Sequence, residues 1–256
     1  MVDLITMGNA TVTPIPGVFE VDLISPRNAT YTPQSLMPIV FALQNPTLDY
    51  TLGASISWDL WEGNNRTSPG SITGGLLEPV TSLTYPPASD PLFVTRFINT
   101  MAYPDGFWTF AWSLQLYHCS PPGCTTKSIT TNNAIVFTVS QSGQASDLVA
   151  ATSFDVCGTM QAYAFNVTSV QETYGVLGPS PTTNPCAATI NASAASSISA
   201  AATAYACSPL QHPLYSNVTC PPLTGKSSND AEQSRMAAAS TLLTLLIMLT
   251  VLIHHG

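Results

Sequence analysis

Charged side chains are scarce in this sequence. Asp, Glu, Lys and Arg together make up 8% of the 256 residues, and only six of them are Lys or Arg. A chain with so few basic residues cannot build the positive patch that nucleic acid requires, so we expect no nucleic-acid partner. Because soluble proteins average about a quarter charged residues, polarity must come from elsewhere. Here it comes from 27 Ser and 32 Thr.

The sequence also lacks the short motifs of common enzyme classes. It contains no Gly-x-Ser-x-Gly, no phosphate-binding Gly loop and no His-Glu-x-x-His. Of the four His, only His118 and His212 lie outside the C-terminal tail, and neither stands at metal-ligand spacing from a cysteine. A lone His is more often structural than catalytic. We therefore expect no enzyme activity, no metal and no cofactor.

Cysteine is absent from the first 118 residues. The six that follow are Cys119, Cys124, Cys157, Cys186, Cys207 and Cys220. An even number without metal-ligand spacing predicts disulfides, and free buried thiols are the alternative. The Pro-Pro-Gly turn between Cys119 and Cys124 predicts a hairpin tip at which the two face each other at disulfide distance. The other four cysteines allow three pairings, which remain open.

Acceptor sequences for N-glycosylation are twice as frequent as chance predicts. Composition alone would give about three Asn-x-Ser/Thr triplets. The sequence has them at Asn9, Asn28, Asn65, Asn166, Asn191 and Asn217. Together with the cysteines, they favour an extracellular glycoprotein.

The C-terminus has the pattern of a signal for a glycosylphosphatidylinositol (GPI) lipid. Residues 236–253 carry no charge, and a polar spacer at 232–235 separates them from small residues at 227–231. We expect lipid attachment at Asn229, with Ser228 as the second choice. The alternative is a single membrane-spanning helix, since the tail is near the length needed. No basic cluster follows the tail to retain such a helix.

The first residues conflict with export. Met1 to Gly8 lack the basic start and the long apolar run of a signal peptide. We expect that the start is misassigned or that the gene model is truncated. A tail-anchored cytosolic protein is the other interpretation, but it leaves the sequons and cysteines unexplained.

Segment 12–142 alternates apolar and polar residues, as β-strands with one buried face do. Phe19, Val21 and Leu23 share one face of such a strand, with Glu20 and Asp22 opposite. Further runs share this pattern: Ile39 to Leu43, Ile56 to Leu60, Phe93 to Phe97, Trp108 to Leu116 and Ile135 to Val139. Separated by Pro, Gly and Asn, they predict a mainly β protein, an antiparallel immunoglobulin-like β-sandwich.

Two features bear on the immunoglobulin-like assignment. Trp58 on an early strand and Asp105-Gly106-Phe107-Trp108 before a late one are typical of that fold. Two departures from that fold are also present. Trp108 stands near the place of the tyrosine whose hydroxyl bonds back to the chain at one corner of immunoglobulin domains, and Trp108 has no hydroxyl. No cysteine precedes Cys119, so the disulfide that links the two sheets of such domains is absent.

Segment 143–225 differs from the first in character. It holds four cysteines and an Ala-rich stretch, Ala192 to Ala206, which predicts a helix because Ala is the best helix former. We expect a disulfide-rich C-terminal appendage in which Cys186 and Cys207 pin that helix. Residues 226–235 would form a stalk carrying the anchor site, and residues 236–256 the apolar signal.

Four stretches carry a resemblance to a known family. They are Gly17 to Pro26, Met37 to Pro46, Phe107 to Cys119, and Asn184-Pro-Cys186 with the Ala/Ser helix up to Cys207. Over about residues 15–220, the chain resembles a family of fungal secreted proteins whose domain has no assigned function. The resemblance implies an extracellular protein, often with a GPI-type tail, and it carries over no catalytic residues.

These patterns leave three functions open. A cell-surface or cell-wall protein with a structural, adhesive or binding role, tethered to the outer face of the plasma membrane, is expected first. A carbohydrate-binding module, with cell-wall polysaccharide as partner, is the second, and Trp61, off the apolar faces like Phe107, is its sugar-stacking candidate. A glycoside hydrolase using Glu20 with Asp22, or Asp59 with Glu62, is the third. Solvated charge is the simpler explanation of Glu20 and Asp22.

Overall fold

The computed structural model describes residues 15–77 and 89–221. Asn9, Asn229, the stalk and the apolar tail therefore lie outside the described residues. The described residues are mainly β, with 44% in strands and 17% in helices. The described residues up to Val218 form one compact unit. In the described ranges, no helix has the length and hydropathy needed to cross a membrane.

The first layer of the sheet has β1 (Gly17–Ser25) near its centre. This strand pairs antiparallel with β3 (Met37–Gln44) on one edge and with β9 (Gln161–Gln171) on the other. Next to β3 lies β6 (Leu92–Ile98), also antiparallel. Both edges of β1 are thus hydrogen-bonded along most of its length, as backbone groups in the interior require.

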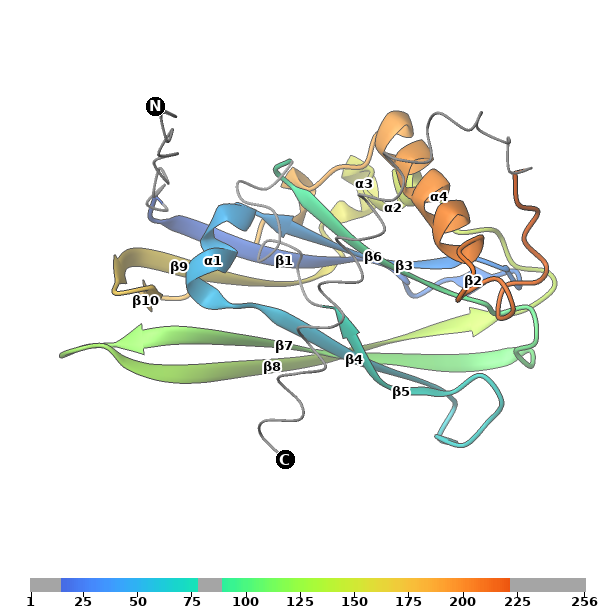
Figure 1. Cartoon of the computed structure of the whole chain (residues 1–256), viewed down its shortest axis with the longest axis horizontal. Helices are drawn as coiled ribbons and strands as arrows, with labels where there is room; N and C mark the ends of the chain where they lie inside the picture. Colours follow the sequence, from blue (N-terminus) through green and yellow to red (C-terminus); the bar gives the residue numbers. More distant parts are fainter. Residues whose placement is uncertain (1–14, 78–88, 222–256) are drawn as a thin grey trace, which may run out of the picture. The chain divides into compact units, whose positions relative to one another are not determined.

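The second layer is built around a long hairpin. Its two arms, β7 (Gly106–Ser120) and β8 (Thr125–Val139), pair from end to end. The other edge of β7 pairs with β4 (Ser55–Glu62), which in turn pairs with β5 (Ile72–Leu77). In Figure 1 this layer lies below the layer that contains β1, β3, β6 and β9.

Two short strands make the sheet mixed rather than purely antiparallel. One, β10 (Tyr174–Leu177), is antiparallel to β9 in the first layer and parallel to β7 in the second. The other, β2 (Thr30–Tyr31), runs parallel to β8. All ten strands therefore belong to one sheet that folds into two layers. The prediction of a wholly antiparallel arrangement was wrong at these two pairings.

The main core lies between the two layers. Trp112 of β7 packs against Phe41 of β3, with ring centroids 5.1 Å apart, and against Tyr163 of β9 at 5.3 Å. Its indole N–H donates to the side-chain oxygen of Gln161 at 2.8 Å. The alternation expected along β4 and β7 holds, since their inward side chains are buried. These are Ile56, Trp58, Leu60, Trp108, Phe110, Trp112, Leu114 and Leu116.

A hydrogen bond from the Trp108 indole closes the turn before β7. The N–H of Trp108 donates to the carbonyl oxygen of Pro104, four residues earlier, at 3.3 Å. The Tyr103 ring stacks on Trp108 with centroids 4.2 Å apart. Trp108 therefore bonds back to the chain just upstream, which is the role that the hydroxyl of a corner Tyr plays in immunoglobulin domains.

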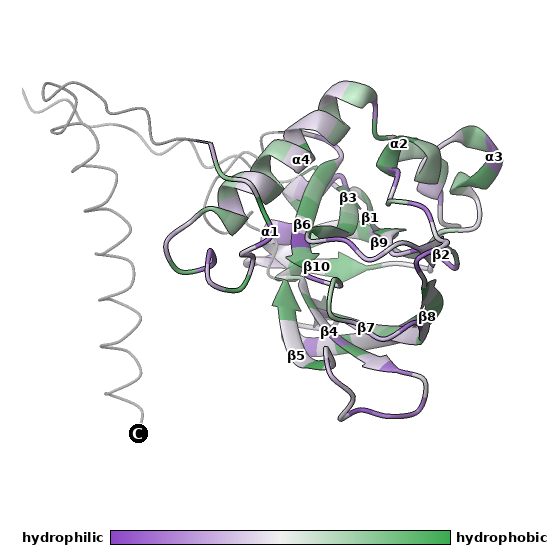
Figure 2. Cartoon of the chain, turned by 90° about the vertical axis from the view of Figure 1, so that its right-hand side faces the viewer, coloured by the Kyte–Doolittle hydropathy of each residue, from purple (hydrophilic) through white to green (hydrophobic). Residues whose placement is uncertain are grey.

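Helices cover the other face of the first layer (Figure 2). They are α2 (Leu148–Ala151), α3 (Phe154–Cys157), η3 (Pro185–Ala187) and α4 (Ala192–Ala206), while η1 (Pro46–Leu48) and α1 (Asp49–Leu52) link β3 to β4. Under the cover lies a second apolar cluster that includes Ile24, Val40, Ala42, Phe97, Leu148, Met160 and Ile198. The central strands of this layer are therefore buried on both faces.

The Ala-rich helix has the predicted bounds, Ala192–Ala206. Asn191 caps its start, accepting a hydrogen bond from the Ala194 N–H at 2.9 Å. Only Ile198, Ala202 and Ala206 of this helix are buried, so it contributes little large apolar surface of its own, as expected.

Segment 143–225 differs from the expected appendage. Its strand β9 pairs with β1 from Gln161 to Val167, inside the sheet, and β10 joins the two layers. A boundary at residue 142 therefore divides a single compact unit. The reason is that β1 needs a hydrogen-bonding partner on each edge, and residues before 143 supply only β3.

Disulfides occupy all six cysteines. Cys119 bonds to Cys124 across the tip of the β7–β8 hairpin, as its turn predicts. Cys157 of α3 bonds to Cys186 of η3, which was one of the open pairings. Cys207 and Cys220 are disulfide-bonded as well, and no described cysteine is free.

Candidate functional site

The acid pair considered for glycoside hydrolysis is not solvated, contrary to the expectation. Glu20 is 2% exposed and Asp22 is 0% exposed. Both point from β1 toward the helical cover, because β1 lies in the layer that is buried on both faces. Alternation marked the correct faces of this strand, but it did not reveal that the polar face is covered too.

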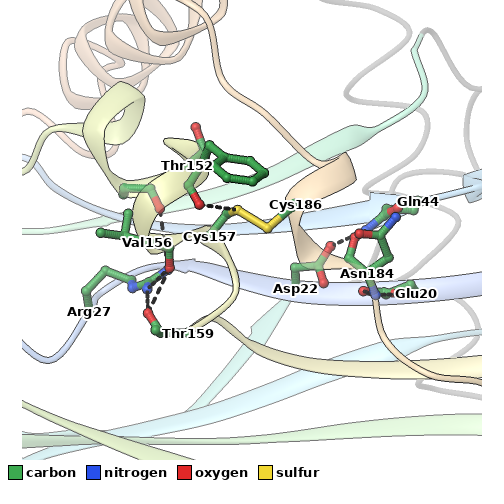
Figure 3. The surroundings of a disulfide bond; sticks show 12 residues. Glu20, Asp22, Arg27, Gln44, Thr152, Val156, Cys157, Thr159, Asn184 and Cys186 are labelled. Atoms are coloured by element: carbon green, nitrogen blue, oxygen red, sulfur yellow. Dashed lines mark hydrogen bonds between the residues drawn. A yellow bond between two sulfur atoms is a disulfide. The ribbon is translucent and has the colours of Figure 1, made fainter.

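Each acid is held by hydrogen bonds beside the Cys157–Cys186 disulfide (Figure 3). The two carboxylate oxygens of Glu20 accept from the Asn184 N–H at 2.7 and 2.9 Å. Asp22 accepts from the side-chain amide of Gln44 at 2.8 Å, and the same amide donates to the Asn184 carbonyl at 3.0 Å. These hydrogen bonds therefore hold Asn184, the residue that precedes η3, against strands β1 and β3 of the sheet.

Burial raises the pKa of Asp22 to about 8. The hydrogen bond from Gln44 opposes this rise in pKa, and the neighbouring Glu20 adds to it by hydrogen bonding and charge repulsion. One carboxylate oxygen of Asp22, Oδ1, has no partner among the described residues. A glycosidase needs both acids to face an open cleft. This buried pair therefore suits a structural role, holding the chain before η3 on the sheet, better than a catalytic one.

The second acid pair does not converge either. Asp59 accepts from the Gly74 N–H at 2.8 Å and lies 3.8 Å from Arg66. Glu62 is three residues further along β4, so it points to the opposite face of the strand.

One face of the Trp61 ring is occupied by a neighbouring cation. The guanidinium of Arg66 lies over its ring, 4.3 Å from the centroid, as in cation–π pairs. The ring is also only partly exposed. Sugar stacking on that face would require Arg66 to move aside, and stacking at Trp61 stays a prediction.

A pocket at the opposite end of β7 gathers three tyrosines. Tyr50 of α1, Tyr117 of β7 and Tyr174 of β10 line a cavity of about 420 Å³. The rest of its lining is Thr51, Gly53, Thr126 and Thr173. No charged side chain takes part. We call this cavity the tyrosine pocket.

Local structure explains how the tyrosine pocket forms. Gly53 ends α1 in a left-handed conformation (φ 52°), which turns the chain from α1 into β4. A side chain at Gly53 would contact the Tyr117 ring, since an added Cβ would lie 3.5 Å from it. On the other side, the Cys119–Cys124 disulfide closes the hairpin tip two residues beyond Tyr117. Sequence reasoning missed this pocket because its tyrosines come from three separate segments.

Most predicted glycosylation sites lie on the surface. Asn28, Asn65, Asn191 and Asn217 are exposed, and Asn166 is partly exposed. Glycosylation itself stays a prediction.

No metal centre is evident in the part of the chain that the structure describes, where no group of three or more His, Cys, Asp or Glu is arranged to hold an ion.

No curated protein and no solved structure matches the chain. A family model described as "Domain of unknown function (DUF7136)" matches residues 14–220, which covers most of the chain, and the chain therefore belongs to the DUF7136 family.

Proposed function

We propose that this protein is a non-catalytic cell-surface or cell-wall glycoprotein that binds carbohydrate through the tyrosine pocket. The observation that carries the proposal is the lining of that pocket. Three aromatic rings and three threonines from separate elements meet around a cavity without charge.

This lining suits a sugar in two ways. A tyrosine ring offers an apolar face to the C–H groups of a pyranose, and its hydroxyl remains able to hydrogen-bond. The threonine hydroxyls add further donors and acceptors. A net charge of −8 on the whole chain disfavours anionic ligands such as nucleotides.

Two further expectations belong to the same proposal. The first is an extracellular location with a GPI lipid at Asn229, or a retained helix at 236–253. The second is an immunoglobulin-like topology for the two-layer sheet, which the bond from Trp108 to Pro104 supports. An adhesive role would follow directly if the anchored protein holds a glycan of the wall or of another cell.

A glycan array tests the binding proposal. We expect neutral glycans to bind the wild-type protein and binding to fall at least about tenfold in Tyr117→Ala, the loss expected for removing one well-placed ring. Phe154→Ala removes an aromatic ring that is 90% exposed on α3, away from the pocket, and serves as the matched control. Trp61→Ala tests the other aromatic candidate. Absence of any glycan ligand would refute the proposal.

The location is tested on cells of the native host. A phosphatidylinositol-specific phospholipase should release the protein into the medium, and treatment with an N-glycosidase should lower its apparent mass. Retention after lipase treatment, with the mass unchanged by the glycosidase, would contradict the anchored-glycoprotein proposal.

A further inference from the structure

The outer face of the β7–β8 hairpin continues directly from the tyrosine pocket. We infer that the ligand is an extended, uncharged polysaccharide chain that lies along this face from the pocket to Phe107. The inference rests on the proposed function and names the class of ligand. We call the surface the hairpin face.

The hairpin face is defined by strand register. Side chains of β7 that alternate with its buried ones point away from the core, and their antiparallel partners on β8 point the same way. Between Phe107 and Tyr117 the β7 positions are Thr109, Ala111, Ser113 and Gln115, and the paired β8 positions from Thr138 to Ser128 include Val136, Ala134, Asn132 and Thr130.

Exposure shows that this surface is open along the described chain. On β8, Ser128, Thr130, Asn132, Ala134 and Val136 are all exposed. The β7 positions between the two end aromatics are partly exposed, while Phe107 is 67% and Tyr117 is 41% exposed. Apart from Val136, the centre of the face therefore carries small or polar side chains, and an aromatic ring stands at each end.

The face and the pocket form one surface. Tyr117 and Thr126 line the tyrosine pocket and also occupy outward positions of β7 and β8. At about 3.3 Å per residue, the distance from Tyr117 to Phe107 is about 33 Å. A single sugar ring would fill only the pocket end, whereas a chain of several rings would reach both aromatic ends.

The chemistry of the face favours a neutral polysaccharide over other occupants. Its β7 and β8 positions between Phe107 and Tyr117 hold hydroxyl, amide and uncharged aliphatic side chains. On the adjoining strand β4, Asp59 lies beside Ala111 and 3.8 Å from Arg66, so the charges nearest to the face are paired with each other. The nearby Lys127 pairs with His118, at positions that alternate with the outward ones. A protein partner would be expected to meet aromatic and large apolar residues at the centre of the surface, but here they stand at its ends.

The test uses oligosaccharides of graded length on the intact protein. Neutral β-1,3-glucan and chitin oligomers, from disaccharide to octasaccharide, are titrated by calorimetry, with oligogalacturonate of equal length as the anionic probe. We expect affinity for one neutral series to rise with length and then level off, and the anionic series to bind more weakly.

Variants separate the inference from the proposed function. Ser113→Arg places a bulky charge at mid-face, and it should weaken binding of the long oligomers about tenfold while leaving the disaccharide unaffected. Ala134→Arg on β8 should act in the same way, and Ser197→Arg, exposed on α4, is the matched control. Tyr117→Ala should weaken binding at every length. Circular dichroism verifies that each variant is folded.

Three outcomes would overturn the inference. If affinity is independent of length and both mid-face variants bind like wild type, the pocket takes a single sugar and only the extended ligand is refuted. If the anionic series binds more tightly, the ligand is not neutral. If no oligomer of any length binds, the proposed function fails with the inference.

Discussion

Replacing Asp22 by Asn should remove most of the stability loss that we expect for this protein between acid and mildly alkaline pH. In the folded chain the pKa of Asp22 is raised from 3.8 to about 8, chiefly by burial. The folded state therefore keeps its proton over a range in which the unfolded chain has lost it. Stability from this group is complete below about pH 3.8, falls as pH rises, and is lost above about pH 8.

The size of the effect follows from the shift. At about 1.36 kcal/mol per pKa unit, it corresponds to a loss of unfolding free energy on the order of 6 kcal/mol between the two limits, as an upper value. Asn has the shape of a protonated Asp. Its oxygen can accept from Gln44, and its amide can take the place of Oδ1, which has no described partner. It removes the titrating proton without opening a cavity.

Urea unfolding at pH 5 and pH 9, followed by tryptophan fluorescence, measures the difference. The wild-type protein should lose several kcal/mol from pH 5 to pH 9, whereas Asp22→Asn should lose much less and be the more stable of the two at pH 9. Asp155→Asn changes an exposed carboxylate on α3 and should follow the wild type. An equal drop in Asp22→Asn and wild type would refute the assignment of this pH dependence to Asp22.

Two other substitutions test the packing. Gly75→Ala should lower the unfolding free energy by about 1–3 kcal/mol, because an added Cβ would clash with the Trp58 ring. Gly158→Ala is the control and should be nearly neutral, since nothing lies within 4 Å of its added Cβ. Equal melting temperatures for the two variants would contradict the close packing on Trp58. Replacing Cys157 and Cys186 together by Ser should cost about 3.5 kcal/mol, the value for a disulfide with a sequence separation of 29. A thermal scan that shows no loss would mean that this bond does not constrain the unfolded chain.

The sequence predicted those elements whose signal is local. The helix Ala192–Ala206 and the buried sides of β4 and β7 follow from composition and alternation over one stretch of chain. The covered face of β1 could not be found in this way, because alternation separates two faces but does not say what packs on each. One signal was present in its neighbour β3, where Val40 and Ala42 alternate with Ile39 and Phe41, so both faces are apolar.

Other features depend on contacts between distant segments. The two parallel pairings involve β2 and β10, which are too short for periodicity to mark. The tyrosine pocket joins Tyr50, Tyr117 and Tyr174, whose proximity follows from the path of the sheet rather than from any one motif. Alternation alone marked Trp61 as a candidate, but it could not show that the guanidinium of Arg66 lies over one face of its ring.

The strand β10 has a consequence for how tightly the pocket can bind. Since β10 is hydrogen-bonded to β9 and to β7, the two layers are joined by backbone as well as by side chains, and one cannot slide over the other without breaking those bonds. Tyr174 and Tyr117 are therefore kept in a constant relative position, which would preorganise the pocket for the sugar ligand that we propose. A preorganised site loses less conformational entropy on association, so even a few ring contacts can yield useful affinity.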